Sequence, residues 1–71
     1  MGSNMTYIAT QSVPVSIVFG DGQKTTGKAG PGFVMKNVSQ GELRIVGTWA
    51  GDPASVVEVL HRYFSQAFRK V

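Results

Sequence analysis

Residues 52–71 read DPASVVEVLHRYFSQAFRKV and carry the most regular apolar spacing in the chain. Asp52 belongs to the residue types that cap a helix N-terminus, and Pro53 suits the first helical position because its missing amide has no partner there. At the helical repeat, the apolar side chains fall within one arc of about 140°. They are Val56, Val57, Leu60, Tyr63, Phe64, Ala67, Phe68 and Val71. The segment therefore predicts an amphipathic helix over about 53–70, with Val59 alone on its polar side.

Four segments before this helix are typical of strands, at about 7–19, 23–28, 33–38 and 43–49. Every second residue of 13–19 is apolar, and Pro14 within it favours a sheet edge or a bulge because proline lacks an amide donor. Asp21-Gly22 follows this run, and an Asp-Gly pair between strand-like segments predicts a tight hairpin turn.

A second hairpin loop is predicted at 39–41, with Gly41 at positive φ. This loop length pairs Phe33 with Gly47 and Met35 with Ile45, and it places Trp49 beside the start of the helix. The predicted fold is α+β: an antiparallel β-meander of three to four strands packed on one C-terminal amphipathic helix.

The chain has 71 residues, no cysteine, one histidine and a formal net charge of +3. Its length predicts one small domain over 5–71, and residues 1–4 resemble a cloning remnant. The lack of cysteine excludes disulfides and thiolate metal sites. The apolar share of 42% exceeds the needs of one thin core, so a homo-oligomer, most simply a dimer, is expected. No segment resembles a spanning helix or a signal peptide, so we expect a cytoplasmic protein without a membrane partner.

The titratable residues have structural explanations that leave no acid–base pair for catalysis. Asp21 and Asp52 suit a turn and a helix cap, and Glu58 precedes Arg62 by four residues, as in a helix surface pair. His61 lies at the border of the apolar arc, where a histidine is usually structural. The sequence predicts no enzyme, no catalytic residue, no metal and no cofactor.

The excess of positive charge indicates an acidic partner such as nucleic acid. Arg69 and Lys70 are accounted for at the end of the predicted helix, where cations complement its dipole. The residues left for phosphate contacts are Lys24, Thr25, Thr26, Lys28, Lys36 and Arg44. Whether 24–28 is a binding loop or a plain hairpin arm stays open at this point. Base-stacking aromatics are scarce, since only Tyr7 lies outside the expected core.

The predicted outer face of the sheet carries Val18, Val34 and Val46 beside these cations, and Val59 interrupts the polar side of the helix. A contiguous apolar patch on such a face is typical of contact with a second chain.

These charges and valines lead to two hypotheses about function. The first is a basic nucleic-acid-binding or regulatory protein that acts as a homodimer, which the charge slightly favours. The alternative is a protein-binding or self-assembling module that docks on a larger protein, as a regulator or inhibitor, through these four valines.

Overall fold

Residues 52–71 form three elements instead of one long helix. In the computed structural model, which describes residues 5–71, they are strand β6 (Asp52–Leu60), helix α1 (His61–Ala67) and strand β7 (Phe68–Lys70). The predicted helix over about 53–70 is therefore wrong for most of its length.

Burial along β6 shows why the strand prevails. The side chains of Ser55, Val57 and Val59 are buried, whereas Val56 and Leu60 on the other face of the strand are exposed. This segment fits a period of two as well as the helical period. Valine favours the strand, because its branched Cβ is restricted in a helix and packs well on a pleated sheet. The seven residues of α1 contain no valine.

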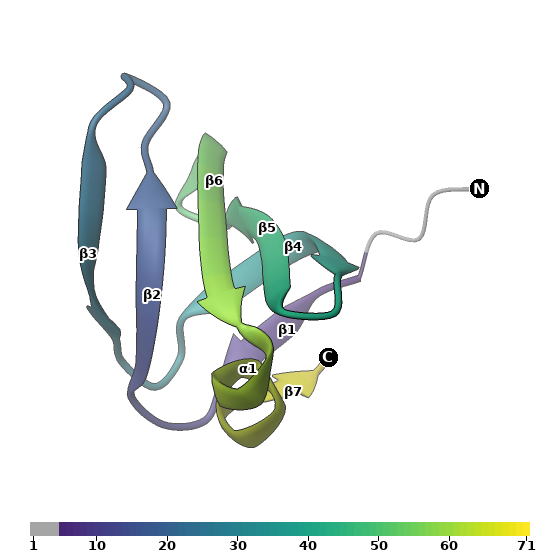
Figure 1. Cartoon of the computed structure of the whole chain (residues 1–71). Coiled ribbons are helices and arrows are strands. Elements are labelled where there is room, and N and C mark those ends of the chain that lie inside the picture. The colour runs from purple at the N-terminus through teal and green to yellow at the C-terminus, as the bar shows by residue number, and fades with distance from the viewer. Residues whose placement is uncertain (1–4) are drawn as a thin grey trace.

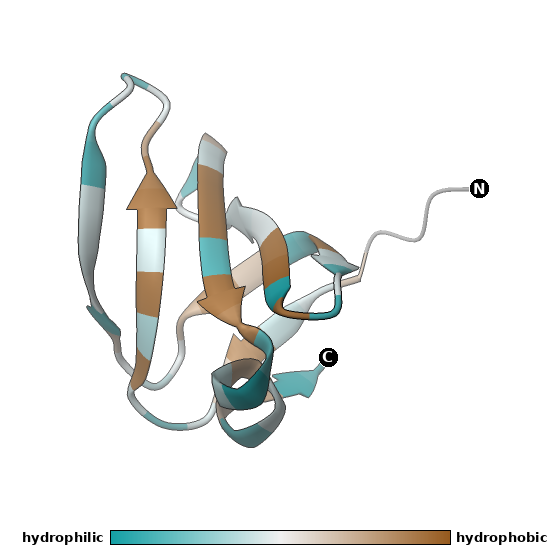
Figure 2. Cartoon of the chain, viewed as in Figure 1, coloured by the Kyte–Doolittle hydropathy of each residue, from teal (hydrophilic) through white to brown (hydrophobic). Residues whose placement is uncertain are grey.

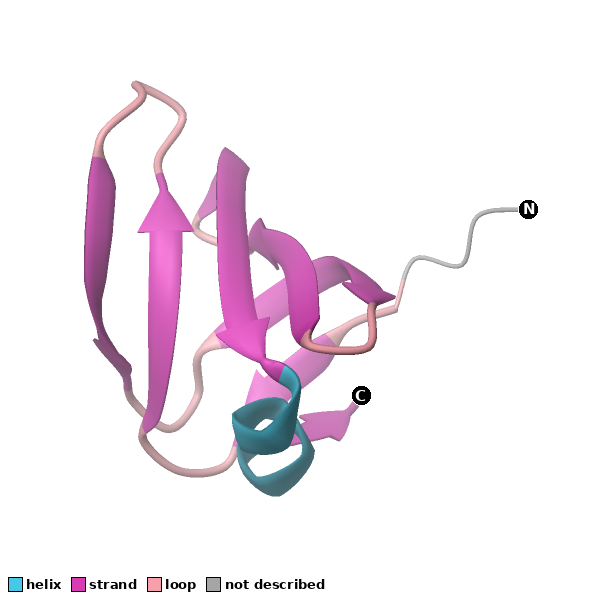
Figure 3. Ribbon diagram, viewed as in Figure 1, coloured by secondary structure: helices cyan, strands magenta, loops and turns pink. Residues whose placement is uncertain are grey.

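The chain builds a seven-stranded antiparallel sheet in the order β3-β2-β6-β5-β4-β1-β7 (Figures 1 and 3). The other strands are β1 (Tyr7–Ala9), β2 (Val13–Val18), β3 (Lys24–Ala29), β4 (Val34–Gln40) and β5 (Arg44–Trp49). The expected meander of three to four strands on a C-terminal helix is wrong, because the segment assigned to that helix supplies two more strands. The predicted cloning remnant at 1–4 lies outside the described residues.

A break in the first predicted strand, 7–19, shapes the sheet. Its halves β1 and β2 are consecutive in sequence, yet β1 pairs with β4 and β2 pairs with β6. The two halves therefore flank the β4–β5–β6 meander, and the sheet curls so that the bend at 10–12 connects its two sides (Figure 1). At the bend, the Thr10 amide and hydroxyl both donate to the Ala67 carbonyl, at 2.6 and 3.0 Å. These bonds tie the bend to the end of α1.

The hairpin predicted at Asp21-Gly22 is confirmed, and β2 and β3 pair along their full length. Gly22 adopts a φ of 93° and donates its amide to the Phe19 carbonyl at 2.9 Å. The Asp21 carboxylate accepts a bond from the Gln23 amide at 3.0 Å, which is a common way for aspartate to stabilise a turn. Figure 2 shows apolar bands alternating with polar ones along β2, as the sequence predicts.

The β4–β5 hairpin has a different register from the predicted one. Met35 lies opposite Trp49 instead of Ile45, and the loop lies at 41–43 instead of 39–41. The difference begins at the loop, because β4 extends to Gln40, which lies opposite Ile45. A β-bulge at Asn37, whose φ is 55°, then shifts the pairing by one residue and interrupts the alternation of the strand. Met35 and Val38 consequently both point into the core although they are three residues apart.

Gly47 lies close beneath this bulge. A Cβ at this position would lie 2.9 Å from the Lys36 carbonyl oxygen and 3.0 Å from the Met35 Cε. The sequence analysis paired Gly47 with Phe33, whereas the structure brings the bulged backbone of β4 against it. The glycine is needed here because only hydrogen fits in the space.

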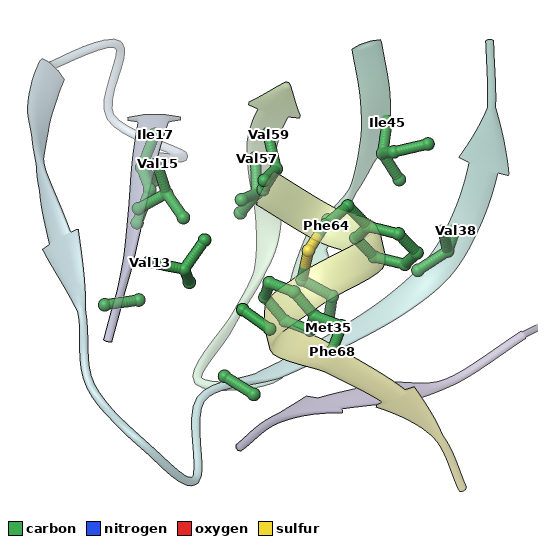
Figure 4. Close-up of a cluster of buried hydrophobic side chains, with 13 residues drawn as sticks. Val13, Val15, Ile17, Met35, Val38, Ile45, Val57, Val59, Phe64 and Phe68 are labelled. Atoms are coloured by element: carbon green, nitrogen blue, oxygen red, sulfur yellow. The ribbon is translucent and has the colours of Figure 1, made fainter. Parts of the chain in front are cut away.

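The core lies inside the curled sheet and against α1 (Figure 4). Side chains from β2, β4, β5 and β6 point toward Phe64 of the helix, as Figure 4 shows. The Phe64 ring stacks on Phe68 at 4.9 Å and meets Tyr7 edge-on at 4.8 Å, measured between ring centroids. The largest of the fully buried side chains are Met35, Ile45, Val13, Val57 and Val59.

Trp49 packs at the turn predicted for it, but strand β6 and not a helix follows that turn. Its ring lies parallel to Phe33, with centroids 6.1 Å apart, and its amide donates to the hydroxyl of buried Ser55 at 3.0 Å. Trp49 therefore closes the core at the β5–β6 turn instead of at the start of a helix.

Candidate functional site

The outer face of the sheet carries exposed apolar side chains over β2, β6 and β5. Val18 of β2 lies opposite Val56 of β6, and Val46 of β5 lies opposite Glu58 of β6. Val56 and Leu60 are each 43% exposed, and Val46 is 37% exposed. Singly exposed apolar residues are ordinary, but neighbours on adjacent strands form a contact surface. We call the surface of Val18, Val46, Val56 and Leu60 the outer patch.

Leu60, at one end of the outer patch, lies beside hollows that the other three patch residues do not line. Three shallow hollows of the described surface each have Leu60 in their lining. One of them, of about 480 Å³, also has Leu43 as an apolar wall, and Leu43 is 77% exposed. Its remaining lining residues are polar or charged: Glu42, Arg44, His61 and Arg62. Hollows with apolar walls and a charged margin suit an anchoring side chain from a partner.

An ion pair crosses this surface between β5 and β6. The Arg44 Nη1 donates to the Glu58 Oε1 at 3.2 Å, and the two side chains are 65% and 44% exposed. The helix pair predicted between Glu58 and Arg62 is absent, because Glu58 lies in β6 and the Arg62 guanidinium lies over the Tyr63 ring at 5.0 Å. Arg44 therefore has a local partner, which reduces its availability for phosphate.

The other candidate cations flank the outer patch on two sides. Lys24 and Lys28 of β3 lie opposite Val18 and Pro14 of β2, so their side chains share the outer face. Lys36 lies on β4, and β2, β6 and β5 separate it from the β3 lysines.

The two candidate threonines of β3 lie on different faces. Thr26 faces Ser16 on the outer side, whereas Thr25 faces Ile17 on the inner side. Lys24, Thr25, Thr26 and Lys28 are all exposed, in a regular hairpin strand and not in a loop. The segment 24–28 is therefore a hairpin arm in conformation.

The four valines proposed as an interface have different positions. Val18 and Val46 belong to the outer patch. Val34 is half-buried and lies opposite Ile8 of β1, apart from Val46, because the observed register places Val46 opposite Ser39. Val59 is 2% exposed and belongs to the core, so its expected position on a polar helix face is wrong.

The patch residues that the sequence analysis missed are Val56 and Leu60. Both were assigned to the apolar side of a helix and therefore to the core. The signal that could have found them is the alternation with Ser55, Val57 and Val59, which places Val56 and Leu60 together on the opposite face of a strand.

Tyr7, the aromatic residue expected to be free, is half-buried, and its hydroxyl accepts a bond from the Gln40 amide group at 3.2 Å.

Asp52 accepts bonds from the Gly20 and Ala54 amides at 3.1 and 3.2 Å, so it stabilises a loop and not a helix N-terminus. Within residues 5–71, no three His, Asp or Glu side chains gather as ligands of a metal ion would.

No helix of the part that the structure describes is long and apolar enough to cross a membrane. Comparison of the chain with protein-family models, with curated proteins and with solved structures finds no match.

Proposed function

We propose that this chain is a small, non-enzymatic and cytoplasmic module that docks on a larger protein through the outer patch. The observation that carries the proposal is the set of partly exposed apolar side chains on three adjacent strands, with hollows beside Leu60. Apolar patches with a polar margin mark protein interaction sites on small domains.

The charges beside the patch favour an acidic margin on the partner. Lys24 and Lys28 lie along one side and Lys36 along the other. Charged groups at the margin of an interface contribute mainly to the rate of association and to the choice of partner. The apolar centre would supply most of the binding free energy.

A homodimer, the assembly expected from the sequence, would use the same patch. Face-to-face contact between two copies would bring the flanking lysines of one copy close to those of the other. Like charges that face each other across an interface are unfavourable. A different protein with acidic groups avoids this cost, so we propose a heterologous partner.

Site-specific photocrosslinking tests this proposal. A photoreactive amino acid is placed at position 60, in the outer patch, and at position 25 as a matched control, because Thr25 is exposed on the opposite face of β3. In an extract of the native cell, we expect one discrete adduct from position 60 and none from position 25. A product with the mass of two copies of this chain, or equal adducts from both positions, would contradict the proposal.

The purified partner then allows a measurement of affinity. Leu60→Ser should weaken binding at least about tenfold, because an anchoring side chain in a hollow contributes more than about 1.4 kcal/mol. Thr25→Ser should leave the dissociation constant unchanged. Equal affinities of the two variants would exclude the outer patch as the interface.

Nucleic acid is a second candidate, favoured by the exposure of Lys24, Lys28 and Lys36, which form no ion pair within residues 5–71. Three phosphate contacts predict that the logarithm of the binding constant falls with a slope of about −2 to −3 against the logarithm of salt concentration. Fluorescence anisotropy with single- and double-stranded oligonucleotides measures this slope. Undetectable binding at low salt would exclude this candidate.

A further inference from the structure

We propose that the free edge of β3 binds an extended acidic segment of a partner protein as an additional antiparallel strand. This site lies on the edge of the sheet and is distinct from the outer patch on its face. Its chemistry combines main-chain hydrogen bonds with two lysine side chains at a spacing that an extended chain can match.

The backbone groups of every second residue of β3 point out of the sheet. β3 ends the sheet, and β2 is its one paired neighbour among the described strands. The Phe19 amide donates to the Gln23 carbonyl at 2.8 Å, which sets the phase of the hairpin. Since hydrogen-bonded residues alternate along an antiparallel pair, the amides and carbonyls of Lys24, Thr26 and Lys28 point away from β2. They form a row of unpaired donors and acceptors.

The edge formed by β3 is open to solvent. Every residue of β3 except Ala29 is exposed, including those on the inner side. On the inner face, an added Cβ at Gly27, opposite Val15, would meet no atom within 4 Å. An incoming strand would therefore meet the backbone of β3 without displacing a described part of the protein.

The two lysine side chains of β3 have a spacing that an extended chain can match. Lys24 and Lys28 share the outer face and are four residues apart, with Thr26 between them. Residues four apart on the incoming strand are separated by the same distance, about 13 Å, and project on one face. An antiparallel strand with acidic residues at these two positions would place a carboxylate opposite each lysine, and opposite charges across strands stabilise the pairing.

The same lysines disfavour a second copy of this chain as the occupant. The antiparallel register that joins all three outward-facing residues of two β3 strands pairs Lys24 of one copy with Lys28 of the other, twice. Like charges directly opposite each other destabilise a strand pair. Lysines on an edge strand also repel basic strands and give neutral strands no charge pairing. An acidic strand is therefore the favoured occupant.

Two synthetic peptides of identical composition test the proposal by fluorescence anisotropy. Each has seven residues, three threonines, two valines and two glutamates; the glutamates are four residues apart in one peptide and three apart in the other. Only the first peptide can present both glutamates on one face of a strand. We expect it to bind the full chain at least about fivefold more tightly than the second. Equal affinities would overturn the proposal, because net charge alone would then explain binding.

Protein variants separate the two components of binding. Lys24→Glu combined with Lys28→Glu should abolish binding of the first peptide. Lys36→Glu combined with Lys70→Glu changes the net charge equally on strands β4 and β7, and should leave binding within about twofold. Thr26→Pro removes one outward-facing amide. Proline is tolerated at such a position of an edge strand, so the melting temperature should not change. Binding of the first peptide should weaken at least about fivefold, because one main-chain hydrogen bond is lost. Full binding by Thr26→Pro would exclude strand addition.

Hydrogen exchange identifies the contact directly. The amides of Lys24, Thr26 and Lys28 should exchange fast in the free protein and slowly with the first peptide bound. Protection of these amides by an oligonucleotide but not by the peptide would overturn the proposal in favour of nucleic acid. The variant Leu60→Ser should bind the peptide normally, so failure at the outer patch and failure at this edge are distinguishable.

Discussion

Val59 and Val56 provide the sharpest test of the architecture, because the helical and extended arrangements of 52–60 assign them opposite environments. In the structure, Val59 is 2% exposed and Val56 is 43% exposed. A helix over the same residues would bury Val56 and expose Val59. The perturbation is truncation of each valine to alanine, which removes the same two methyl groups at both positions.

The expected magnitudes follow from burial. Removing two buried methyl groups costs about 1.6 kcal/mol in transfer free energy, and the cavity raises the loss of unfolding free energy to about 2–3 kcal/mol for Val59→Ala. Val56→Ala loses partly hydrated surface and some strand propensity, so it should cost less than about 1 kcal/mol. For a domain of this size, 1 kcal/mol lowers the melting temperature by about 4–8 °C.

The assay is urea unfolding followed by the fluorescence of Trp49, the one tryptophan of the chain. With a slope near 1 kcal/mol per molar urea, Val59→Ala should lower the midpoint by about 2–3 M, and Val56→Ala by less than about 1 M. Equal shifts, or a larger shift for Val56→Ala, would refute the strand assignment of 52–60 and restore the helix.

Three further changes test local features. Gly47→Ala should lower the free energy of unfolding by about 1–3 kcal/mol, because its Cβ would lie 2.9 Å from the Lys36 carbonyl oxygen; Gly27→Ala, which meets no atom within 4 Å, is the control, and equal melting temperatures would contradict the close approach. Asn37→Val should cost about 1–2 kcal/mol and Asn37→Gly much less, because a φ of 55° is strained for a branched residue; chemical denaturation compares them. Arg44→Ala should change the unfolding free energy by less than about 1 kcal/mol at any salt concentration, because its ion pair is exposed; a larger, salt-sensitive loss in calorimetry would contradict this.

The two proposed contact regions place different demands on a partner. The outer patch requires an apolar anchor that fits beside Leu60, whereas the β3 edge requires an extended chain with two acidic residues. One protein could engage both, since Lys24 lies directly opposite Val18 of the patch. Strand addition would then extend the sheet at the margin of the apolar surface, and the two contacts would share one continuous interface.

The candidate site was only partly predictable from sequence. The alternation within 13–18 placed Val18 on the outer face, and the alternation of β5 did the same for Arg44 and Val46, because period-two burial is a local property of a strand. Val56 and Leu60 were missed because their segment satisfies two periods at once. The expected neighbour relation of Val34 and Val46 failed because the hairpin loop lies at 41–43 instead of 39–41, and the position of a loop sets every pair of its hairpin.

Features that depend on a few adjacent residues could be predicted from the sequence alone. The Asp21-Gly22 turn is such a feature, because a short carboxylate and a residue that tolerates positive φ are sufficient to reverse the chain. The inward side of β2 is another, because its alternating valines and isoleucine admit one buried face. The strand conformation of 52–60, in contrast, depends on its neighbours in the sheet. β6 fills the position between β2 and β5, where its backbone groups pair on both sides and its buried face joins their core. A pattern compatible with either period contains no information about these two neighbours, so the choice between helix and strand depended on the sheet around it.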